Sequence, residues 1–346
     1  SYDGAGRKVS ETDFSGKIVN YTYNNLDQQI QVNAPFDGTN TMESRQVYDF
    51  NGNVVKSRVK TGADSYRETY NGYDSMNRLS YSAYNEEDGS KTYVQYGYDS
   101  TGNMTAMVNG LSALMENVNT GTVPEGAART RYEYDFLNNM TKMIAPDGTE
   151  KTYEYDMFGN VLEEGFPDGS ISYTYSAMNE LLSMTGTKGT ESKTYTYEYD
   201  TLGRRTQASY DGKTISNQYD QIGRMVKETE NRGAGNNIVK EYSYDSAHNV
   251  ETFVLKEGGN TSQSLRYNYD YLNRMVKVSE PGKALTLAEY TYDSNNNLTK
   301  ESLNNGQYEV QYSYNAANLI TGMVNKQLSG SQTLSSYSYT YSLDGN

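Results

Sequence analysis

The sequence YEYDTLGR at residues 197–204 and the similar sequence YNYDYLNR at residues 267–274 contain the pattern that decides the fold. Both have the form Tyr-x-Tyr-Asp-x-x-Gly/Asn-Arg. Two tyrosines separated by one residue point to the same face of a β-strand. The aspartate that follows is a residue type that hydrogen-bonds backbone amides and opens turns. Each copy therefore predicts a strand that ends in a tight turn.

The pattern recurs fifteen times along the chain, with a mean spacing of about 24 residues. Eleven units also carry a tyrosine two residues before the tyrosine that precedes the acidic position, here called the anchor tyrosine. The two slots together account for 26 of the 36 tyrosines, so the chain is predicted to present one aromatic strand face. The anchors are Tyr2, Tyr23, Tyr48, Tyr73, Tyr98, Tyr134, Tyr155, Tyr175, Tyr199, Tyr219, Tyr244, Tyr269, Tyr292, Tyr314 and Tyr341.

The position four residues after each anchor predicts the shape of the turn. Its occupant is Gly seven times, Asn six times, and Asp27 and His248 once each. These residue types best tolerate positive φ, so we predict a left-handed turn residue, after which a second strand returns. The structural positions on which this prediction rests most directly are Tyr98, Asp99, Gly102, Tyr153, Tyr155, Asp156, Gly159, Tyr197, Tyr199, Asp200, Gly203, Arg204, Tyr267, Tyr269, Asp270, Asn273 and Arg274.

A second set of turns between the units is marked by the dipeptide Asp-Gly, a strong hairpin signal. The chain is therefore predicted to be all-β, a continuous antiparallel sheet of tandem hairpins. We expect one array over residues 1–346, truncated at both ends, with residues 110–129 as an insertion that includes a short helical turn at 111–118. The Asp-Gly pairs are Asp37-Gly38, Asp88-Gly89, Asp147-Gly148, Asp168-Gly169 and Asp211-Gly212.

The expected number of strands, close to thirty, constrains the overall shape. At about 4.8 Å per strand the ribbon would run roughly 140 Å, and closed as one ring it would be about 45 Å across. Twisted sheets of this length curl, and a barrel this wide is not filled by its own side chains. We therefore predict a hollow shell or spiral. A β-propeller of paired units is the second hypothesis, and a parallel β-helix is the third.

Composition excludes several classes of function. The chain has no Cys, no Trp and one His, which removes disulfides, thiolate chemistry and two-histidine metal sites. Its net charge of −14, with no run of Lys or Arg, argues against nucleic acid as a partner. No apolar stretch reaches the roughly 20 residues that a membrane span needs.

Three possible chemical sites are better explained by the repeat. His248 lies in the left-handed turn slot, although it is the one candidate histidine base. Asp293, Asn295 and Asn297 match the first three ligands of a calcium loop but lack its later glycine and glutamate. A glycosidase needs only two suitably spaced carboxylates, yet most acids here occupy repeat positions. We expect no catalytic residue, metal or cofactor, and no enzyme activity.

The repeat unit resembles the YD repeat of RHS proteins. That family includes bacterial polymorphic toxins, wall-associated proteins, the B and C subunits of insecticidal toxin complexes, and teneurins. The resemblance extends over essentially the whole chain and implies a spiral shell that encloses a C-terminal toxin or effector domain. It also implies a secreted or cell-surface location. The family's C-terminal core, where an aspartyl autoprotease acts, is not recognisable, so self-cleavage is not assigned to any residue.

Two functions therefore remain open. The first is a non-catalytic shell segment whose partner is an enclosed toxin or effector. The second is a surface or wall-associated module that binds carbohydrate through its tyrosines.

Overall fold

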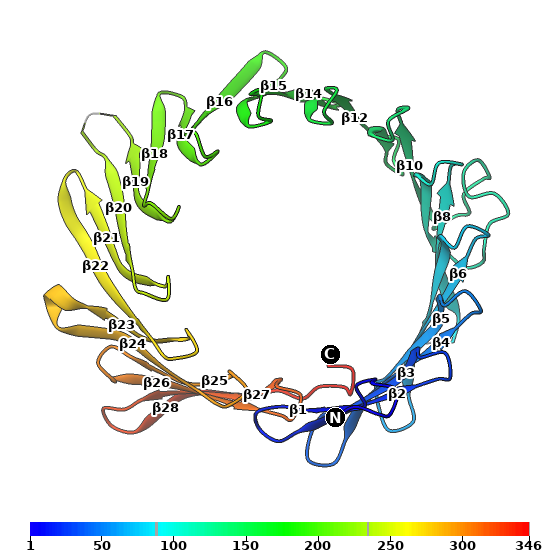
Figure 1. Ribbon diagram of the computed structural model, residues 1–346, viewed down its shortest axis with the longest axis horizontal. Coiled ribbons are helices and arrows are strands. Elements are labelled where there is room, and N and C mark those ends of the chain that lie inside the picture. The colour runs from blue at the N-terminus through cyan, green and yellow to red at the C-terminus, as the bar shows by residue number, and fades with distance from the viewer. Residues whose placement is uncertain (87–88, 234, 346) are drawn as a thin grey trace.

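The computed structural model describes residues 1–86, 89–233 and 235–345 as one curved, antiparallel β-sheet (Figure 1). One 3-10 turn, η1(Pro281–Lys283), is the helical element among these residues. The strands are β1(Ser10–Thr12), β2(Ile18–Tyr23), β3(Gln29–Pro35), β4(Thr41–Tyr48), β5(Val54–Lys60), β6(Tyr66–Tyr73), β7(Leu79–Asn85), β8(Lys91–Tyr98), β9(Met104–Leu111), β10(Ala128–Tyr134), β11(Met140–Ile144), β12(Glu150–Tyr155), β13(Val161–Phe166), β14(Gly169–Tyr175), β15(Leu181–Lys188), β16(Glu191–Tyr199), β17(Arg205–Tyr210), β18(Lys213–Tyr219), β19(Met225–Asn231), β20(Ile238–Tyr244), β21(Val250–Glu257), β22(Asn260–Tyr269), β23(Met275–Glu280), β24(Leu285–Tyr292), β25(Leu298–Leu303), β26(Tyr308–Tyr314), β27(Ile320–Gln327) and β28(Gln332–Ser338).

Every strand pairs with the next strand in the chain, and all of these pairings are antiparallel. This confirms the predicted meander of hairpins. It also removes the propeller, which would divide the strands into separate blades, and the parallel β-helix. Figure 1 shows the sheet curled into a hollow ring whose first and last strands lie side by side.

The two ends of the sheet overlap along a seam. The Asn295 side-chain amide donates to the Asp13 carboxylate at 2.8 Å, across 282 residues of sequence. Further along, Ala317 N donates to Phe36 O at 3.2 Å and Leu343 N donates to Thr61 O at 3.1 Å. Arg67 pairs with Asp344 at 2.7 Å. The sheet is therefore a spiral that completes one revolution and begins a second.

The seam also fixes the size of the ring. The turn between β24 and β25 rests on the turn between β1 and β2, and the turn after β26 rests on the turn after β3. One revolution therefore takes 23 strands, which corresponds to a diameter of about 35 Å. This is narrower than the single ring of about 45 Å expected from sequence, because the last strands stack on the first ones instead of widening the circle.

The insertion packs on the outer face of the wall. Gln95 exchanges two hydrogen bonds with the backbone of Met115, at 3.0 and 2.8 Å, and Thr105 donates to Asn119 at 2.9 Å. The largest fully buried side chains, Val108 and Leu111, lie in β9 beside this loop. Residues 112–127 form turns without a helix, so the expected helical turn at 111–118 is wrong.

The second set of turns matches the prediction at three Asp-Gly pairs, since Asp37-Gly38, Asp147-Gly148 and Asp211-Gly212 each lie between consecutive strands. At Asp168-Gly169 the hairpin turn is one residue earlier, at Pro167-Asp168, because Gly169 already begins β14 and pairs with Phe166. Asp211 and Gly212 have φ of 49° and 71°, as a two-residue hairpin with a right-handed twist requires. The pair Asp88-Gly89 includes a residue that lies outside the described residues.

Candidate functional site: the tyrosine-faced interior wall

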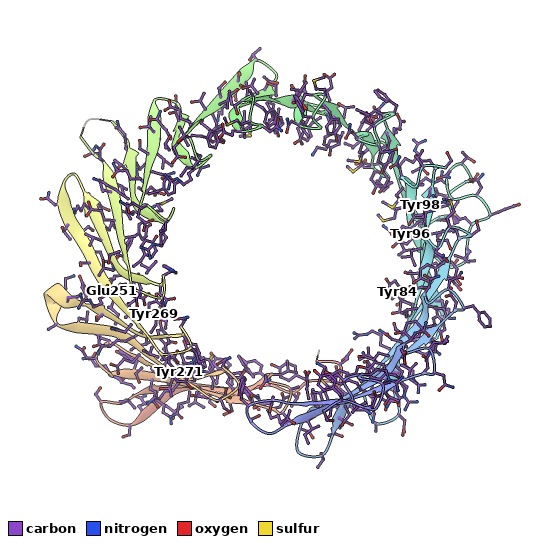
Figure 2. The ribbon with its side chains drawn as sticks, viewed as in Figure 1. Tyr84, Tyr96, Tyr98, Glu251, Tyr269 and Tyr271 are labelled. Atoms are coloured by element: carbon purple, nitrogen blue, oxygen red, sulfur yellow. The ribbon has the colours of Figure 1, made fainter. Side chains whose placement is uncertain are left out.

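The tyrosine face of the sheet lines the interior of the ring. Tyr84, Tyr96 and Tyr98 share one face by strand register, and Figure 2 shows Tyr84 and Tyr96 on the interior side of the wall. Gly97 points to the opposite face, where a Cβ would meet Val118 and Asn119 of the outer loop. The interior is therefore aromatic, and the alternate positions of the same strands face outward.

The fifteen turns that follow the anchor tyrosines share one backbone geometry. The residue four after each anchor has φ between 60° and 101° in all fifteen units, His248 included at 69°. This confirms the predicted left-handed turn. In the copy at 199–205, Asp200 Oδ1 accepts the backbone N–H groups of Leu202 and Arg204, and Oδ2 accepts Arg204 Nε at 2.7 Å. The aspartate therefore holds the turn closed.

The turn hydrogen bonds lower the pKa of all eleven aspartates in this slot. At Asp156 the side-chain amide of Asn160 is the largest cause. At Asp99 burial acts to raise the pKa, but hydrogen bonds from Thr101 and Asn103 outweigh it and bring the value to about 2. These carboxylates are thus charged structural groups at neutral pH, unlike a general acid, which would need a raised pKa. The other nine are Asp3, Asp49, Asp74, Asp135, Asp200, Asp220, Asp245, Asp270 and Asp293.

The anchor tyrosines connect successive units. From Tyr23 onward, each anchor hydroxyl donates to the carbonyl six residues after the previous anchor, at 2.6–3.1 Å in all fourteen cases. For example, Tyr199 Oη donates to Leu181 O at 2.9 Å. The side chain therefore spans the interior face from one hairpin to the preceding one. The sequence led us to expect packing by the ring and a hydroxyl partner in water or on a neighbouring strand, but it did not identify this carbonyl as the acceptor.

A β-bulge accompanies the anchor in thirteen units. Tyr199 pairs with Arg205 and Glu198 pairs with Gln207, so Thr206 has no partner in the ladder. The same shift occurs at the other anchors from Tyr23 to Tyr314. A bulge bends its strand and increases the twist. Repeated in thirteen units, it provides the curvature that the curled sheet needs.

Five units add an arginine that reaches the next unit. Arg274 lies over the Tyr292 ring at 4.7 Å, and its Nη1 donates to Asp293 O at 3.2 Å. Arg7, Arg78, Arg204 and Arg224 stack in the same way on the following anchor, at 4.5–5.1 Å. Arg224 also donates to His248 Nδ1 at 3.0 Å, and a guanidinium has no acceptor, so this nitrogen accepts. His248 is thereby held as a turn residue.

The calcium-like triplet belongs to the turn and the seam. Asp293 Oδ1 accepts the backbone N–H groups of Asn295 and Asn297, and its Oδ2 accepts the Asn297 side chain. The Asn295 amide nitrogen faces Asp13 and Ser15 across the seam. Among the described residues, no group of three or more Asp, Glu or His side chains is placed to hold a metal ion.

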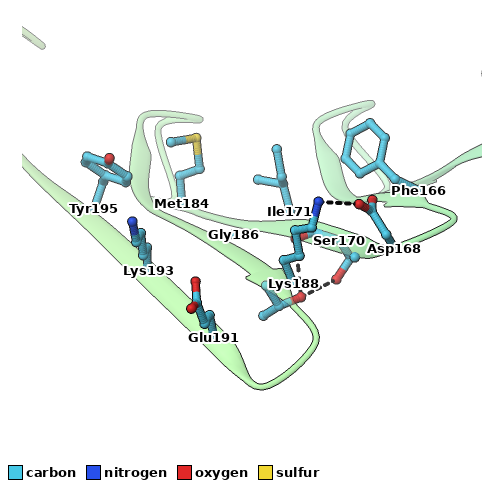
Figure 3. Close-up of a pocket in the computed structure, with 12 residues that line it drawn as sticks. Phe166, Asp168, Ser170, Ile171, Met184, Gly186, Lys188, Glu191, Lys193 and Tyr195 are labelled. Carbon is cyan, nitrogen blue, oxygen red and sulfur yellow. Dashed lines mark hydrogen bonds and ion pairs between the residues drawn. The ribbon is translucent and has the colours of Figure 1, made fainter.

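An open groove of about 470 Å³ crosses the interior face between β13 and β16 (Figure 3). Met184 pairs with Tyr173 and Tyr195 in register, which places the groove on the tyrosine face. Phe166 and Ile171 continue the apolar lining, and Lys188 at the rim pairs with Asp168 at 2.5 Å. Gly186 lies in its lining, and a Cβ there would meet nothing within 4 Å. The groove offers apolar area and charge but no set of reacting groups.

Comparisons with known proteins agree with this geometry. The teneurin YD-shell model matches residues 129–277, and the RHS repeat model matches residues 292–327. Residues 129–277 and 292–327 are therefore similar to the YD and RHS repeats of these families. Among solved structures, a TcdB2-TccC3-TEV crystal structure has a TM-score of 0.54 at 12% identity, over 95% of this chain and 22% of that one. A Photorhabdus luminescens Tc holotoxin pore has a TM-score of 0.52 at 12% identity, over 96% and 21%.

These likenesses place the chain in the YD-shell fold. The chain spans about a fifth of the length of the solved chains it matches. A search of curated proteins finds no match. Within residues 1–86, 89–233 and 235–345, no helix is long and apolar enough to cross a membrane.

Proposed function

We propose that this chain is a non-catalytic wall segment of a secreted RHS-type shell that encloses a toxin or effector polypeptide. The observation that carries the proposal is that the two ends of the sheet meet at the seam. The sheet thus closes around a hollow centre with its tyrosine face on the inside. The repeat family supports a structural shell role. On this proposal, catalysis belongs to the enclosed polypeptide.

The interior groove supports the choice of a polypeptide as cargo. Phe166, Ile171 and Met184 offer apolar contact, and stacked rings of Tyr195 and Tyr210, with centroids 4.4 Å apart, extend it. Such a surface suits side chains of an incompletely folded chain, which exposes apolar groups. Tyrosine hydroxyls elsewhere on the wall are already bonded to carbonyls, so the wall presents mostly ring surface to its contents.

The test compares an interior and an exterior position in the cysteine-free chain. Gly186→Cys places a thiol in the groove, and Glu154→Cys places one on the outer face; each is coupled to a photo-crosslinker. We expect a fluorescently tagged, chemically unfolded polypeptide to cross-link from position 186 at several times the yield from position 154. Equal yields from the two positions would contradict enclosure.

A second candidate function, binding of surface carbohydrate, is favoured by a separate observation. The outer face over β4 and β5 carries a groove lined by cations and amides.

A further inference from the structure

One rim of the ring carries a row of exposed apolar side chains. From Tyr23 to Tyr314, each turn that follows an anchor tyrosine joins an even-numbered strand to the next odd-numbered strand, so these turns share one edge of the meander, here called the anchor-turn rim. The two residues after the acidic position form the tip of each turn. Nine tips carry large apolar side chains that are 50–107% exposed: Leu26, Phe50, Met76, Phe136, Leu137, Met157, Phe158, Met178, Leu202, Ile222, Tyr271 and Leu272.

These tips together form more apolar surface than a monomeric protein usually exposes. Successive tips are two strands apart, or about 10 Å, so the side chains of neighbouring tips lie close together. The five units from Tyr134 to Tyr219 form an uninterrupted run. At roughly 100 Å² apiece the twelve side chains expose about 1,200 Å², whereas each partner in a standard interface contributes roughly 800 Å². Exposed patches of this size mark interaction sites.

The seam shows what covers such a tip. Three successive tips rest there on three successive turns of the second set, those of β1–β2, β3–β4 and β5–β6. The first two tips carry small or polar residues, with Asn295 and Ala317 making the contacts. The third carries Leu343, whose N–H donates to Thr61 O at 3.1 Å and whose side chain is only 8% exposed. An apolar tip is therefore buried when a turn of the second set lies against it.

The opposite edge of the sheet, here called the second-turn rim, holds the turns of the second set. The seam occupies it over β1 to β6. Further along, this rim also presents apolar groups. Phe166 and Leu328 are 36% and 43% exposed, and Pro146, Pro167 and Pro281 are exposed as well. Because one array of hairpins forms both rims, their turns have the same spacing, and the seam shows that one tip meets one turn.

We propose that the anchor-turn rim docks a second copy of this chain through that copy's second-turn rim, so that rings stack head to tail. A second copy offers the type of surface that buries Leu343 at the seam, at the spacing that the tips require. Each added copy again presents an uncovered rim, so a stack along the ring axis does not close on itself. This inference concerns the rims and does not depend on what the interior holds.

Two other occupants fit the observations less well. A second copy turned face to face would place tip against tip, but at the seam each tip meets a turn of the second set. A lipid surface would have to accept the aspartate beside each tip. Hydrogen bonds lower the pKa of Asp156 and Asp200, which keeps both charged at neutral pH. Moving such charges toward hydrocarbon is costly.

The test measures self-association of the purified chain by sedimentation velocity over a wide range of protein concentration. The parent is expected to form oligomers beyond the dimer whose average mass grows with concentration. Phe136→Ser/Phe158→Ser should associate at least about tenfold more weakly, since burying one such ring contributes more than the roughly 1.4 kcal/mol that a tenfold change requires. The matched control is Leu162→Ser/Leu182→Ser, at exposed apolar positions on the outer face, which should associate like the parent.

A mixing experiment separates head-to-tail from face-to-face contact. The double phenylalanine variant keeps its second-turn rim, so it should still bind the tips of parent copies and limit the growth of their oligomers. If it does not join parent oligomers, the tips contact one another and the inference is overturned. The inference also fails if the parent stays monomeric at every concentration, if the double phenylalanine variant associates like the parent, or if the parent binds phosphatidylcholine vesicles as a monomer. None of these failures would bear on the proposed enclosure, which rests on the interior face.

Discussion

The wall at β7 to β10 and the wall at β13 to β16 are built from the same repeat, but they are packed differently. At β7 to β10 the outer loop covers one face while tyrosines cover the other, and Ala83, Ala106, Val108 and Leu111 are at most 1% exposed. At β13 to β16 the outer face is bare, and Leu162 and Leu182 are 38% and 39% exposed. The repeat therefore stands without a two-sided core, and the insertion adds one locally.

The largest expected contrast comes from truncating a leucine in each region. Leu111→Ala leaves a cavity under the loop and should cost about 2–5 kcal/mol of unfolding free energy. Leu162→Ala, at an exposed position of β13, should change it by about 0.5 kcal/mol or less. Urea denaturation of both variants measures the difference. Equal costs would mean that the loop adds no core.

A second contrast uses two glycines whose surroundings differ. A Cβ at Gly97 would lie 2.3 Å from Asn119 Oδ1 and 2.7 Å from Val118, so Gly97→Val should displace the loop and cost about 1–3 kcal/mol. Gly186→Val, facing the open groove, should be nearly neutral. Cleavage by a glutamyl endopeptidase after Glu116 should become faster in Gly97→Val and stay slow in Gly186→Val.

A third experiment measures how much an anchor hydroxyl contributes to the free energy of unfolding in the part of the wall that the outer loop does not cover. Tyr199→Phe removes the bond to Leu181 O and should cost about 0.5–1.5 kcal/mol. Tyr197→Phe in the same strand is the control, since no hydrogen bond of its hydroxyl is found in the described residues. Urea denaturation of the two variants should give free energies of unfolding that differ by this amount. Identical values would mean that the anchor contributes through packing alone.

The smallest expected effect of a single substitution is on the loss of stability at low pH. Both regions share the aspartate turns that cause this loss. The pKa of Asp99 is about 2 in the fold, below the unfolded value of about 3.9, so the unfolded chain binds protons first. Stability present at neutral pH should therefore decline as pH falls from about 4 to about 2. Asp99→Asn should shrink this decline slightly, as followed by circular dichroism. A decline that begins near pH 6 would point to other groups.

The sequence was sufficient for the hairpins and the turns, because each depends on residues within one unit. Asp200 and Gly203 act on neighbours four residues away, and their residue types encode that geometry directly. The tyrosine periodicity likewise predicted the aromatic face. The hydrogen bond from Tyr199 Oη to Leu181 O was not predicted. Its geometry depends on the β-bulge beside the anchor, and that bulge has no recognisable signal in the sequence.

Contacts between different strands also could not be predicted, because they depend on more than the residues of one repeat unit. The pairing of Asn295 with Asp13 depends on how many strands complete a revolution, which reflects small twists added over the whole ring. The position of Arg45 opposite Arg58 depends on the exact register between β4 and β5. The helical turn expected at 111–118 was wrong because the Met115 backbone bonds to Gln95, and Asn119 just after it bonds to Thr105, so this segment is held against the wall.

The hydroxyl bond from each anchor to the hairpin before it gives the array a direction and makes it modular. Every unit offers a carbonyl on one side and a tyrosine on the other, so removing one whole unit, such as the segment from Tyr199 to Gln218, would let Tyr219 meet Leu181 O with the same geometry. The ring would contract by two strands, or about 10 Å of circumference. Internal volume would thus change in steps as repeats are gained or lost, without the design of any new contact within the wall.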